Sequence, residues 1–451
     1  MARRHIPRYP GLPHVKDASV RDKRVFLRCD LNVPIRQGKI QDESRICAVL
    51  RSLHWLLDNG AKVVVGSHLG RPYEVRQDDP LRMQKLFGMT LRPVAERLST
   101  LLGYEVPLIG ERLDPLARQT MSLDAIREVG VHLGQRGPRV ALLENLRFWR
   151  GEKDNDDTLA SQFGELADLY VNDAFGTCHR RHSSIDLVTK KFEGCAYGGF
   201  LLHEELARLE KLRQSKERPN KSAEMYVVVL GGREIDHRCA ALLNLKPRPD
   251  CFLIGGDCAY TLLDAQGHQV GTSYVDRTAG VASVLSRLED ERMDVVLPVD
   301  VLTAMDLDDT SEAEEAPMVD FPRDKAGFDI GKETRKRFRG ILAKADRILW
   351  VGPMGVFTDW RYNTGTREIV KGIAFSGAYT VAGGADTMWA INHFGLAREF
   401  THISTGGSAM LLYLSGSMLA GIQALKNPGA AGTAGSGSAG VPRDGLWTSR
   451  G

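Results

Sequence analysis

Short apolar runs alternate with segments of helical periodicity along most of the chain. The runs are rich in valine, isoleucine and leucine, and each is followed by glycine or by a cluster of polar residues. Nearly continuous apolar runs of this kind are typical of strands that are buried on both faces of a sheet. We predict strands at residues 24–28, 62–66, 139–143, 169–172, 225–230, 251–254, 294–298, 347–351 and 379–382.

The segments between these runs carry apolar residues at helical spacing. Residues 42–59 are the clearest example, because Ile46, Val49, Leu53 and Leu57 share one helical face and the pattern stops before Gly60. Strands that alternate with such helices form parallel sheets covered by helices. We therefore predict an α/β fold in which ligands bind beyond the carboxyl ends of the strands.

Three segments depart from the alternation. Residues 200–220 combine a charged helical stretch with a polar end, which indicates a connector. Residues 306–322 are acidic and contain two prolines, so we expect a surface loop. The last segment is mainly Gly, Ala and Ser, as in a flexible tail. The domain limits that we predict are 1–200, a connector at 201–222, a second domain at 223–405 and a tail at 427–451.

Size and charge narrow the classes of function. The 451 residues are enough for two or three domains. The 60 Lys and Arg against 57 Asp and Glu leave a net charge of +3, which is too balanced for binding nucleic acid or a membrane surface by charge alone. The apolar runs are also far shorter than the roughly 18 residues that span a bilayer. We predict no nucleic-acid partner and no membrane insertion.

The cysteines indicate a reducing environment. Seven of them are scattered without a Cys-x-x-Cys pair, which disfavours a disulfide framework and a zinc ribbon. The first 24 residues are rich in arginine, but Pro7, Pro10 and Pro13 interrupt the helix that a transit peptide would need. We expect the cytoplasm or another reducing compartment, with no clear targeting signal.

The predicted strands of the first half end in groups that bind anions. The loops after these strands, together with the first helix, supply Asp30, Asn32, Arg45, His68, Arg71, Arg147 and Arg180. A single arginine is more often a solvated surface residue, but four that converge at one sheet edge favour a bidentate oxyanion site. This half of the sequence predicts a pocket for a small molecule that carries phosphate and carboxylate.

The strands of the second half end in glycine-rich turns instead. These turns contain Gly231, Gly232, Gly255, Gly352, Pro353, Gly383 and Gly384, and the last is followed by Asp386 and Thr387. Glycine lets the backbone approach a flat or phosphorylated ligand closely. Asp386 and Thr387 fall at a predicted helix start, where they either cap the helix or hold metal and phosphate.

Five motifs resemble those of the phosphoglycerate kinase family. They are Asp-Leu-Asn-Val-Pro at 30–34, Ser-His-Leu-Gly-Arg-Pro at 67–72, Asn-Asp-Ala-Phe-Gly-Thr at 172–177, Gly-Pro-Met-Gly-Val-Phe at 352–357 and Ser-Thr-Gly-Gly at 404–407. The resemblance, which covers residues 21–425, implies two Rossmann-like parallel-sheet domains joined by a hinge helix. It also implies a glycolytic phosphoryl transfer between 1,3-bisphosphoglycerate and ADP, and a segment 406–426 that returns to the N-terminal domain.

The resemblance assigns roles to the residues already singled out. All seven side chains of the predicted anion pocket match the family's site for 3-phosphoglycerate, and Arg45 is also implied in catalysis. The glycine turns, with Asp386 and Thr387, match the site for ADP or ATP. Mg²⁺ would be held there by Asp386 through the nucleotide.

The second half departs from the family where charge matters. The family reads Gly-Gly-Ala-Lys-Val-x-Asp-Lys, and an ungapped match puts Glu234 at the catalytic lysine and Arg238 at the second lysine. His203 and Glu204 occupy the region of another phosphate-facing lysine. The other departures are Val351 for asparagine, Thr358 for the glutamate on the ribose, and Ala385 and Ser408 for glycines.

These departures leave three alternatives open. The first is a pseudoenzyme that still binds a phosphorylated acid, with activity weak or lost because of Glu234. The second is a structural or scaffolding subunit of a larger assembly, and the third is a working phosphoglycerate kinase with unusual nucleotide contacts. In the first two, nucleotide binding is doubtful, and the chain needs no cofactor.

Overall fold

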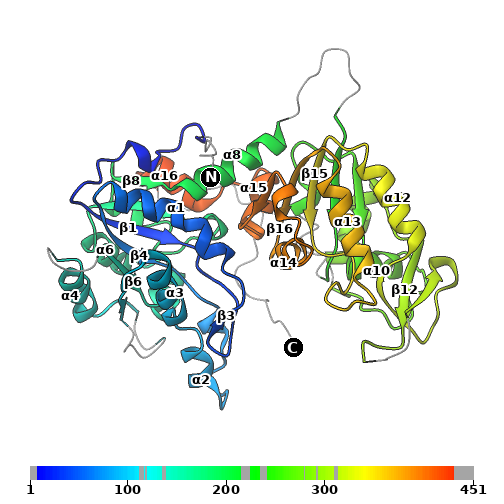
Figure 1. Ribbon diagram of the computed structural model, residues 1–451, viewed down its shortest axis with the longest axis horizontal. Helices are drawn as coiled ribbons and strands as arrows, with labels where there is room; N and C mark the ends of the chain where they lie inside the picture. The colour runs from blue at the N-terminus through cyan, green and yellow to red at the C-terminus, as the bar shows by residue number, and fades with distance from the viewer. Residues whose placement is uncertain are drawn as a thin grey trace.

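Two α/β halves, each built on a six-stranded parallel sheet, make up the chain (Figure 1). The computed structural model describes residues 8–110, 116, 119–134, 139–214, 224–233, 241–278, 280–290, 293–308 and 313–430. All nine predicted strands are present, with ends that differ by no more than two residues. The prediction of two parallel-sheet domains is therefore confirmed.

The first sheet has the strand order β5-β6-β4-β1-β7-β8, and all its pairs are parallel. Its strands are β1 (Arg24–Cys29), β4 (Lys62–Gly66), β5 (Leu108–Ile109), β6 (Val140–Leu143), β7 (Leu169–Asp173) and β8 (Ala196–Gly198). A small hairpin, β2 (Ile35–Arg36) and β3 (Lys39–Ile40), follows β1. The helices of this half are α1 (Ser44–Asp58), α2 (Arg82–Phe87), α3 (Arg92–Leu102), α4 (Leu123–His132), α5 (Arg150–Asp154), α6 (Asp157–Glu165) and α7 (Val188–Lys191).

The second sheet has the order β11-β10-β9-β15-β16-β17, again with parallel pairs. Its strands are β9 (Tyr226–Leu230), β10 (Cys251–Ile254), β11 (Asp294–Val296), β15 (Arg347–Val351), β16 (Tyr379–Gly383) and β17 (His402–Ser404). The helices of this half are α10 (Gly256–Ala265), α11 (Gly280–Asp290), α12 (Lys332–Leu342), α13 (Thr364–Ala374) and α14 (Ala385–His393). The central strand β9 is buried at every position, which explains its uninterrupted apolar run.

A third sheet corrects the expectation of a surface loop at residues 306–322. Part of that acidic segment is a strand, β13 (Glu314–Pro317), which pairs antiparallel with β12 (Asp300–Ala304) in the order β13-β12-β14. The remaining strand is β14 (Ala326–Ile330). Only Ala316 of β13 is buried, and its neighbours Glu314 and Glu315 are exposed. Charged residues are common on edge strands because they discourage further pairing, so composition alone concealed this strand.

Helix α8 (Phe200–Arg213) connects the two halves. At its start the Leu202 N–H donates to Asp173 Oδ1 at 2.9 Å, at the end of β7. Near its end the Leu212 carbonyl accepts from Arg347 Nη1 at 2.7 Å, at the start of β15. One helix thus contacts both sheets. Of the predicted connector, residues 215–222 lie outside the described residues, as does residue 223.

The chain then crosses back after β17. Helices α15 (Ser408–Leu414) and α16 (Ala420–Lys426) follow that strand, and α15 contacts both α8 and the short turn of 3₁₀-helix at Phe175–Thr177. Helix α16 contacts α7 and β8, and the Gly421 N–H donates to the Cys178 carbonyl at 2.8 Å. The last described segment of the chain therefore lies on the first half of the molecule.

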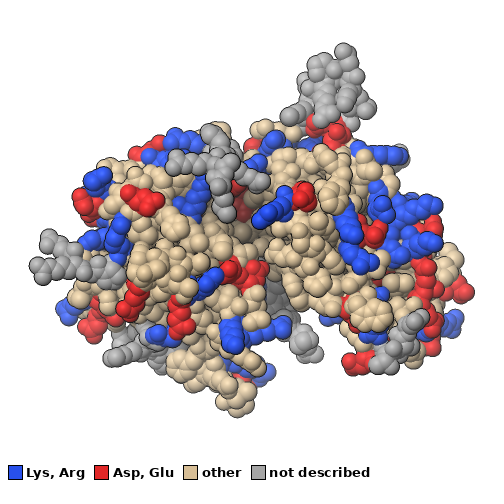
Figure 2. Space-filling view, in the orientation of Figure 1, with Lys and Arg blue, Asp and Glu red and all other residues tan. Residues whose placement is uncertain are grey.

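Both cationic and anionic side chains occur on the visible face of each half, mostly toward the flanks, and the middle of that face carries few of them (Figure 2). The near-neutral total of +3 agrees with this distribution. Any strong attraction for an anion must therefore come from a local arrangement of side chains. In the part of the chain that the structure describes, no helix has the length and apolar character needed to cross a membrane.

Candidate active site at the carboxyl edges of the two sheets

Four neighbouring strands of the first sheet, β6, β4, β1 and β7, end at the same edge. The loops that follow carry the predicted anion-binding residues, so the topology brings them to one side of the sheet. His68 and Arg147 are buried and Arg45 and Arg71 are partly exposed. The predicted set therefore combines buried cationic side chains with cationic side chains that reach solvent at this edge.

Hydrogen bonds between the loops hold this edge together. Arg45 Nη1 lies 2.5 Å from Asp30 Oδ2, which ties α1 to the end of β1. Asn32 Oδ1 accepts from the Gly70 N–H at 2.9 Å, and Arg147 Nη1 donates to the Gly70 carbonyl at 2.6 Å. The loop after β4 is thus fixed by the loops on both sides of it. The predicted residues of this edge therefore position one another.

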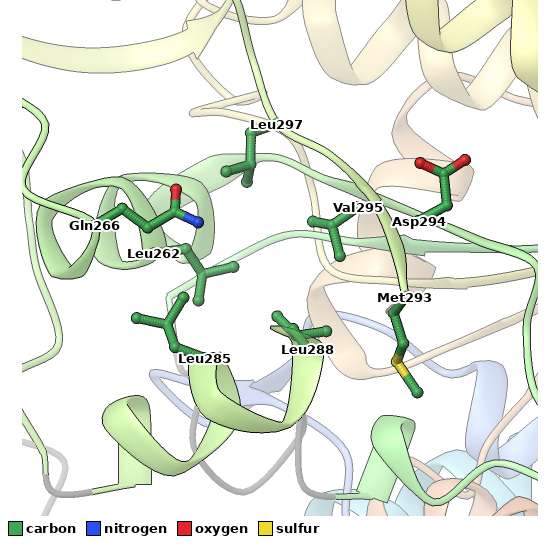
Figure 3. A pocket seen from close by; sticks show the side chains of 8 residues that line it. All are labelled: Leu262, Gln266, Leu285, Leu288, Met293, Asp294, Val295 and Leu297. Atoms are coloured by element: carbon green, nitrogen blue, oxygen red, sulfur yellow. The ribbon is translucent and has the colours of Figure 1, made fainter. Parts of the chain in front are cut away.

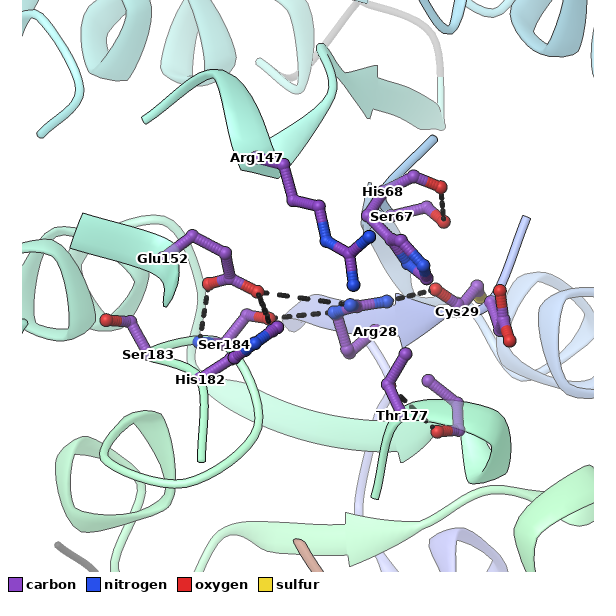
Figure 4. Close-up of polar contacts among 12 residues, drawn as sticks. Arg28, Cys29, Ser67, His68, Arg147, Glu152, Thr177, His182, Ser183 and Ser184 are labelled. Atoms are coloured by element: carbon purple, nitrogen blue, oxygen red, sulfur yellow. Dashed lines mark hydrogen bonds and ion pairs between the residues drawn. The ribbon is translucent and has the colours of Figure 1, made fainter. Parts of the chain in front are cut away.

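A buried polar layer lies beneath this site, and the sequence analysis missed it. Arg28 is completely buried and donates through Nε to Ser184 Oγ at 2.8 Å, while its Nη2 lies 3.9 Å from Glu152 Oε1. Ser184 Oγ donates to Glu152 Oε1 at 2.6 Å, and His182 Nδ1 lies 3.7 Å from the same oxygen. Figure 4 shows the Arg147 side chain pointing toward the guanidinium group of Arg28, which lies within this network. An arginine inside the otherwise apolar run of β1 was the available signal.

The histidines of this edge are held neutral. Burial, together with the neighbouring Arg180 and Arg147, lowers the pKa of His179 to about 4. Burial and the same kind of cationic neighbours hold the pKa values of His68 and His182 well below the ordinary value of 6.5. Burial also lowers the pKa of Arg147 to about 10, so this guanidinium is still cationic at neutral pH.

Several buried polar atoms of this edge have no hydrogen-bond partner among the described residues. They are Nδ1 of His68, His179 and His182, Nε of Arg147 and Nη2 of Arg28. Buried donors are normally satisfied, and unsatisfied ones concentrated in one place indicate a site for a ligand or ordered water. Cationic and neutral donors together suit an anion that carries several oxygen atoms.

The corresponding edge of the second sheet is built differently. The Gly231 N–H donates to the Val351 carbonyl at 2.9 Å and the Gly232 N–H to the Pro353 carbonyl at 2.8 Å. Gly352 has φ +91°, and a side chain on it would collide with the Gly231 carbonyl. The glycines of these turns are thus required where the loops contact one another, in addition to any approach to a ligand.

The turn after β16 presents one carboxylate to solvent. Gly384 has φ +100° and precedes α14, whose first turn contains Asp386. Asp386 is exposed, whereas Thr387 is buried and its Oγ1 accepts from the Gly352 N–H at 2.7 Å. An exposed carboxylate is a ligand type that Mg²⁺ prefers. No cluster of three or more His, Cys, Asp or Glu suited to a metal occurs among the described residues.

The departures from the family pattern fall into two groups. Glu234 and Arg238 lie outside the described residues. The others are placed as follows: Val351 is buried at the end of β15, and Thr358, Ala385 and Ser408 are exposed. Arg233, which precedes Glu234 in the sequence, pairs through Nε with Asp257 Oδ2 at 3.0 Å. Its guanidinium lies 4.4 Å from the ring centre of Tyr274.

His203 and Glu204 point to different partners. The His203 ring is completely buried, and its centre lies 4.3 Å from that of His14, in the segment before β1. Glu204 Oε1 lies 3.7 Å from Arg208 Nη2 on the next turn of α8. His203 therefore faces the start of the chain, and Glu204 pairs with a cation of its own helix.

A cavity of about 340 Å³ lies elsewhere, between α10, α11 and β11 (Figure 3). Its lining is mostly aliphatic and includes Leu262, Leu285 and Leu288, with Asp294 at the start of β11. Asp294 marks the amino end of a parallel strand, so the cavity lies away from the carboxyl edge that carries the glycine turns. It adds no polar group to either edge.

The regions matched in known proteins span both halves of the chain. The model of the phosphoglycerate kinase family matches residues 15–417. Phosphoglycerate kinase of Borrelia duttonii is 36% identical over 417 residues, covering 91% of this chain and 98% of that protein. The enzyme of Finegoldia magna is 37% identical over 413 residues, with the same coverage of 91% and 98%.

Solved structures give the same result. Phosphoglycerate kinase from Pyrococcus horikoshii superposes with a TM-score of 0.75 at 30% identity, covering 92% of this chain and 98% of that one. The structure from Coxiella burnetii has a TM-score of 0.71 at 32% identity, covering 92% and 99%. By sequence and by fold, the chain belongs to the phosphoglycerate kinase family.

Proposed function

We propose that the edge of the first sheet binds 3-phosphoglycerate or a closely similar phosphorylated acid. The observation that carries this proposal is the set of buried donors without partners around His68, His179 and Arg147. Family membership supplies the substrate class, because phosphoglycerate is the acid on which that family acts.

The two ends of such a ligand find different partners here. A phosphate needs cationic donors with fixed geometry, and Arg147 is fixed by its 2.6 Å bond to the Gly70 carbonyl. A carboxylate accepts well from neutral donors, which the low pKa values of His68 and His179 provide at neutral pH. Asp30 neutralises Arg45 at 2.5 Å, so the site is cationic without an excess of unpaired charge.

We further propose that phosphoryl transfer by this chain is slow or absent. Two arginines close in sequence to the positions of the family's phosphate-facing lysines are already paired with carboxylates. Arg233 pairs with Asp257 at 3.0 Å, and Arg208 pairs with Glu204 at 3.7 Å. Losing one preorganised donor costs about 3 kcal/mol in the transition state. A carboxylate in place of the family's lysine, as Glu234 is in the ungapped match, would repel phosphoryl oxygens about 4 Å away. This repulsion raises the barrier by roughly another 4 kcal/mol at an effective dielectric constant near 20. The two effects together correspond to a rate lower by about 10⁵-fold.

On the nucleotide side we propose weak binding of ADP or ATP with Mg²⁺. The exposed Asp386 would hold the metal, which would neutralise charge on the phosphate oxygens. Gly384 and the N-terminal turn of α14 offer backbone donors to a phosphate. Thr358 and Val351, however, supply no charge where the family pattern has polar groups.

Two measurements on the purified full-length protein test these proposals separately. Calorimetric titration with 3-phosphoglycerate should give saturable heat at up to millimolar ligand, and its absence from folded protein would refute the acid site. A coupled assay with ATP and 3-phosphoglycerate should give turnover well below the roughly 1–100 s⁻¹ of ordinary kinases. Turnover of tens per second would establish the working-kinase alternative instead.

The substitution Glu234→Lys distinguishes the causes of slow transfer. If the reversed charge is the main defect, the variant should turn over faster than the unmodified protein while binding 3-phosphoglycerate equally well. If it gains nothing, the defect is spread over the nucleotide side. Stoichiometric purification of the native protein with a large complex would then favour the structural alternative.

A further inference from the structure

The segment that precedes β1 contains contacts that the family pattern does not account for. The family match begins at residue 15, yet residues 8–14 are described and contribute two buried side chains, Leu12 and His14. We call residues 8–14 the strap. A terminal segment that buries side chains is tied to the fold rather than free in solution.

One end of the strap is anchored on the first sheet. His14 forms a parallel bridge with Gly198 at the end of β8, and the Gly198 N–H donates to the Pro13 carbonyl at 2.8 Å. The His14 ring also lies edge-on to Phe200, with ring centres 5.1 Å apart. The strap therefore extends the edge of the first sheet up to the start of α8.

From there the strap runs along the connecting helix. The Tyr9 N–H donates to His203 Nδ1 at 3.1 Å, and His203 Nε2 lies 3.3 Å from the Pro13 carbonyl. His203 is thus held by two residues of the strap, one through each ring nitrogen. This arrangement explains why His203 is buried among the mainly apolar buried residues of α8.

The other end of the strap reaches the helices that return from the second half. Tyr9 Oη lies 3.2 Å from Tyr413 Oη on α15, and Tyr413 donates to Glu210 Oε2 on α8 at 2.8 Å. The Lys426 ammonium of α16 lies 5.2 Å from the centre of the Tyr9 ring. Tyr9 therefore links the outgoing helix α8 to both helices of the returning chain.

These contacts join the only two described crossings between the halves. The chain leaves the first half through α8 and returns after β17 through α15, and Figure 1 shows both helices at the junction of the halves. A change in the angle between two domains must be absorbed where the connections between them meet. We propose that the strap restrains this junction and limits how far the two halves swing relative to one another.

Hydrogen–deuterium exchange of the full-length protein tests the restraint. Tyr9→Ala removes the ring and hydroxyl at the junction and should speed exchange of amides in α8 and α15. Loss of one hydrogen bond with a net value near 1 kcal/mol corresponds to about five-fold faster exchange. Tyr9→Phe keeps the ring and should give a smaller increase, and small-angle scattering of Tyr9→Ala should show a larger radius of gyration.

Arg8→Gln is the matched control. Arg8 also belongs to the strap, but its partner is the exposed Asp17 of the first half at 2.7 Å, so its loss leaves the contacts of Tyr9 with α8, α15 and α16 in place. Exchange in α15 that is unchanged in Tyr9→Ala, or equally fast in Arg8→Gln, would overturn the proposal. So would faster exchange with unchanged scattering, because the strap would then stabilise helices without restraining the halves. Neither readout depends on phosphoryl transfer or on ligand binding.

Discussion

The carboxyl edges of the two sheets are both formed by the loops that follow parallel strands, but they differ in the chemical groups that line them. At the first edge, buried cations and neutral imidazoles converge, and several of their donors have no partner among the described residues. At the second edge, the backbone groups of Gly231 and Gly232 are satisfied by the neighbouring loop at 2.9 and 2.8 Å. The unpartnered donors of the first edge thus belong to side chains, whereas the glycine turns of the second edge satisfy one another and leave Asp386 exposed beside them.

The difference shows where each edge can tolerate change. The first edge depends on charge balance, because Arg28 is buried with Glu152 as its nearest carboxylate. The second depends on the absence of side chains, because its loops touch through glycine backbone. Substitutions that alter charge should therefore damage the first edge most, and substitutions that add atoms should damage the second.

The largest effect is expected on the free energy of unfolding of the variant Glu152→Gln. This change leaves the guanidinium of the fully buried Arg28 without its counter-charge at 3.9 Å. Removing one partner of a buried pair costs about 3–5 kcal/mol of unfolding free energy. Urea unfolding should show this loss. In the control Asp78→Asn, which breaks an exposed pair with Arg76, stability should not change measurably, and equal loss in both variants would contradict the charge argument.

The next largest effect is expected from Gly352→Ala. Gly352 has φ +91°, and an added methyl group would collide with the Gly231 carbonyl, so backbone strain and a steric clash act together. We expect a loss of about 3 kcal/mol in the unfolding free energy. Gly267→Ala has a similar φ of +85° but open space around it, and strain alone should cost about 1 kcal/mol there. Calorimetric unfolding that finds the two variants equally stable would refute the clash.

The sequence predicted the sheets well because their strands are buried on both faces. The run at β9, for example, is apolar at all five positions, and every one of them is buried. β13 was missed because three of its four residues are exposed, two of them charged, and only Ala316 is buried. The hydrophobic pattern of a sequence reveals strands that are buried on both faces. It does not reveal a strand of which only one side chain faces the core.

The candidate sites were predictable to different degrees. The strand-end pattern and the first helix placed Asp30, Arg45 and Arg147 at one edge, but they could not reveal Glu152 and Ser184, which meet Arg28 only through the fold. Sequence spacing carries no signal for contacts of this kind. The roles assigned to Glu234 and Arg238 rest on the family pattern alone and remain predictions.

A smaller effect on ligand binding is expected from Arg71→Ala. If Arg71 donates to the ligand, a lost hydrogen bond to a charged group costs about 1.5–3 kcal/mol, a 10- to 150-fold weaker affinity for 3-phosphoglycerate. Arg76→Ala removes the same charge from the same loop, yet Arg76 is exposed and pairs with Asp78 at 2.6 Å. Titration calorimetry should show near-normal affinity for Arg76→Ala, and equal weakening in both would indicate an effect of net charge only.

The smallest effect concerns the response of the two edges to acid. Burial raises the pKa of Asp173 in the first half and of Asp329 in the second to about 7. Each of these carboxyl groups binds a proton more tightly when folded, so each contributes stability that grows as pH falls through 7. The buried histidines act with the opposite sign, and His68, His179 and His182 all belong to the first edge.

His179→Gln isolates the histidine contribution. The folded pKa of about 4 lies below the ordinary 6.5, so the unfolded chain takes up the proton first and stability is lost as pH falls below 6.5. Between pH 6.5 and 5.5 this loss amounts to about 1 kcal/mol for one histidine. The variant should lose less stability over that interval than the unmodified protein, as measured by urea unfolding at both pH values. His54→Gln changes an exposed histidine of the same half and should keep the original response, so parallel profiles for all three proteins would show that the buried imidazole is not held neutral.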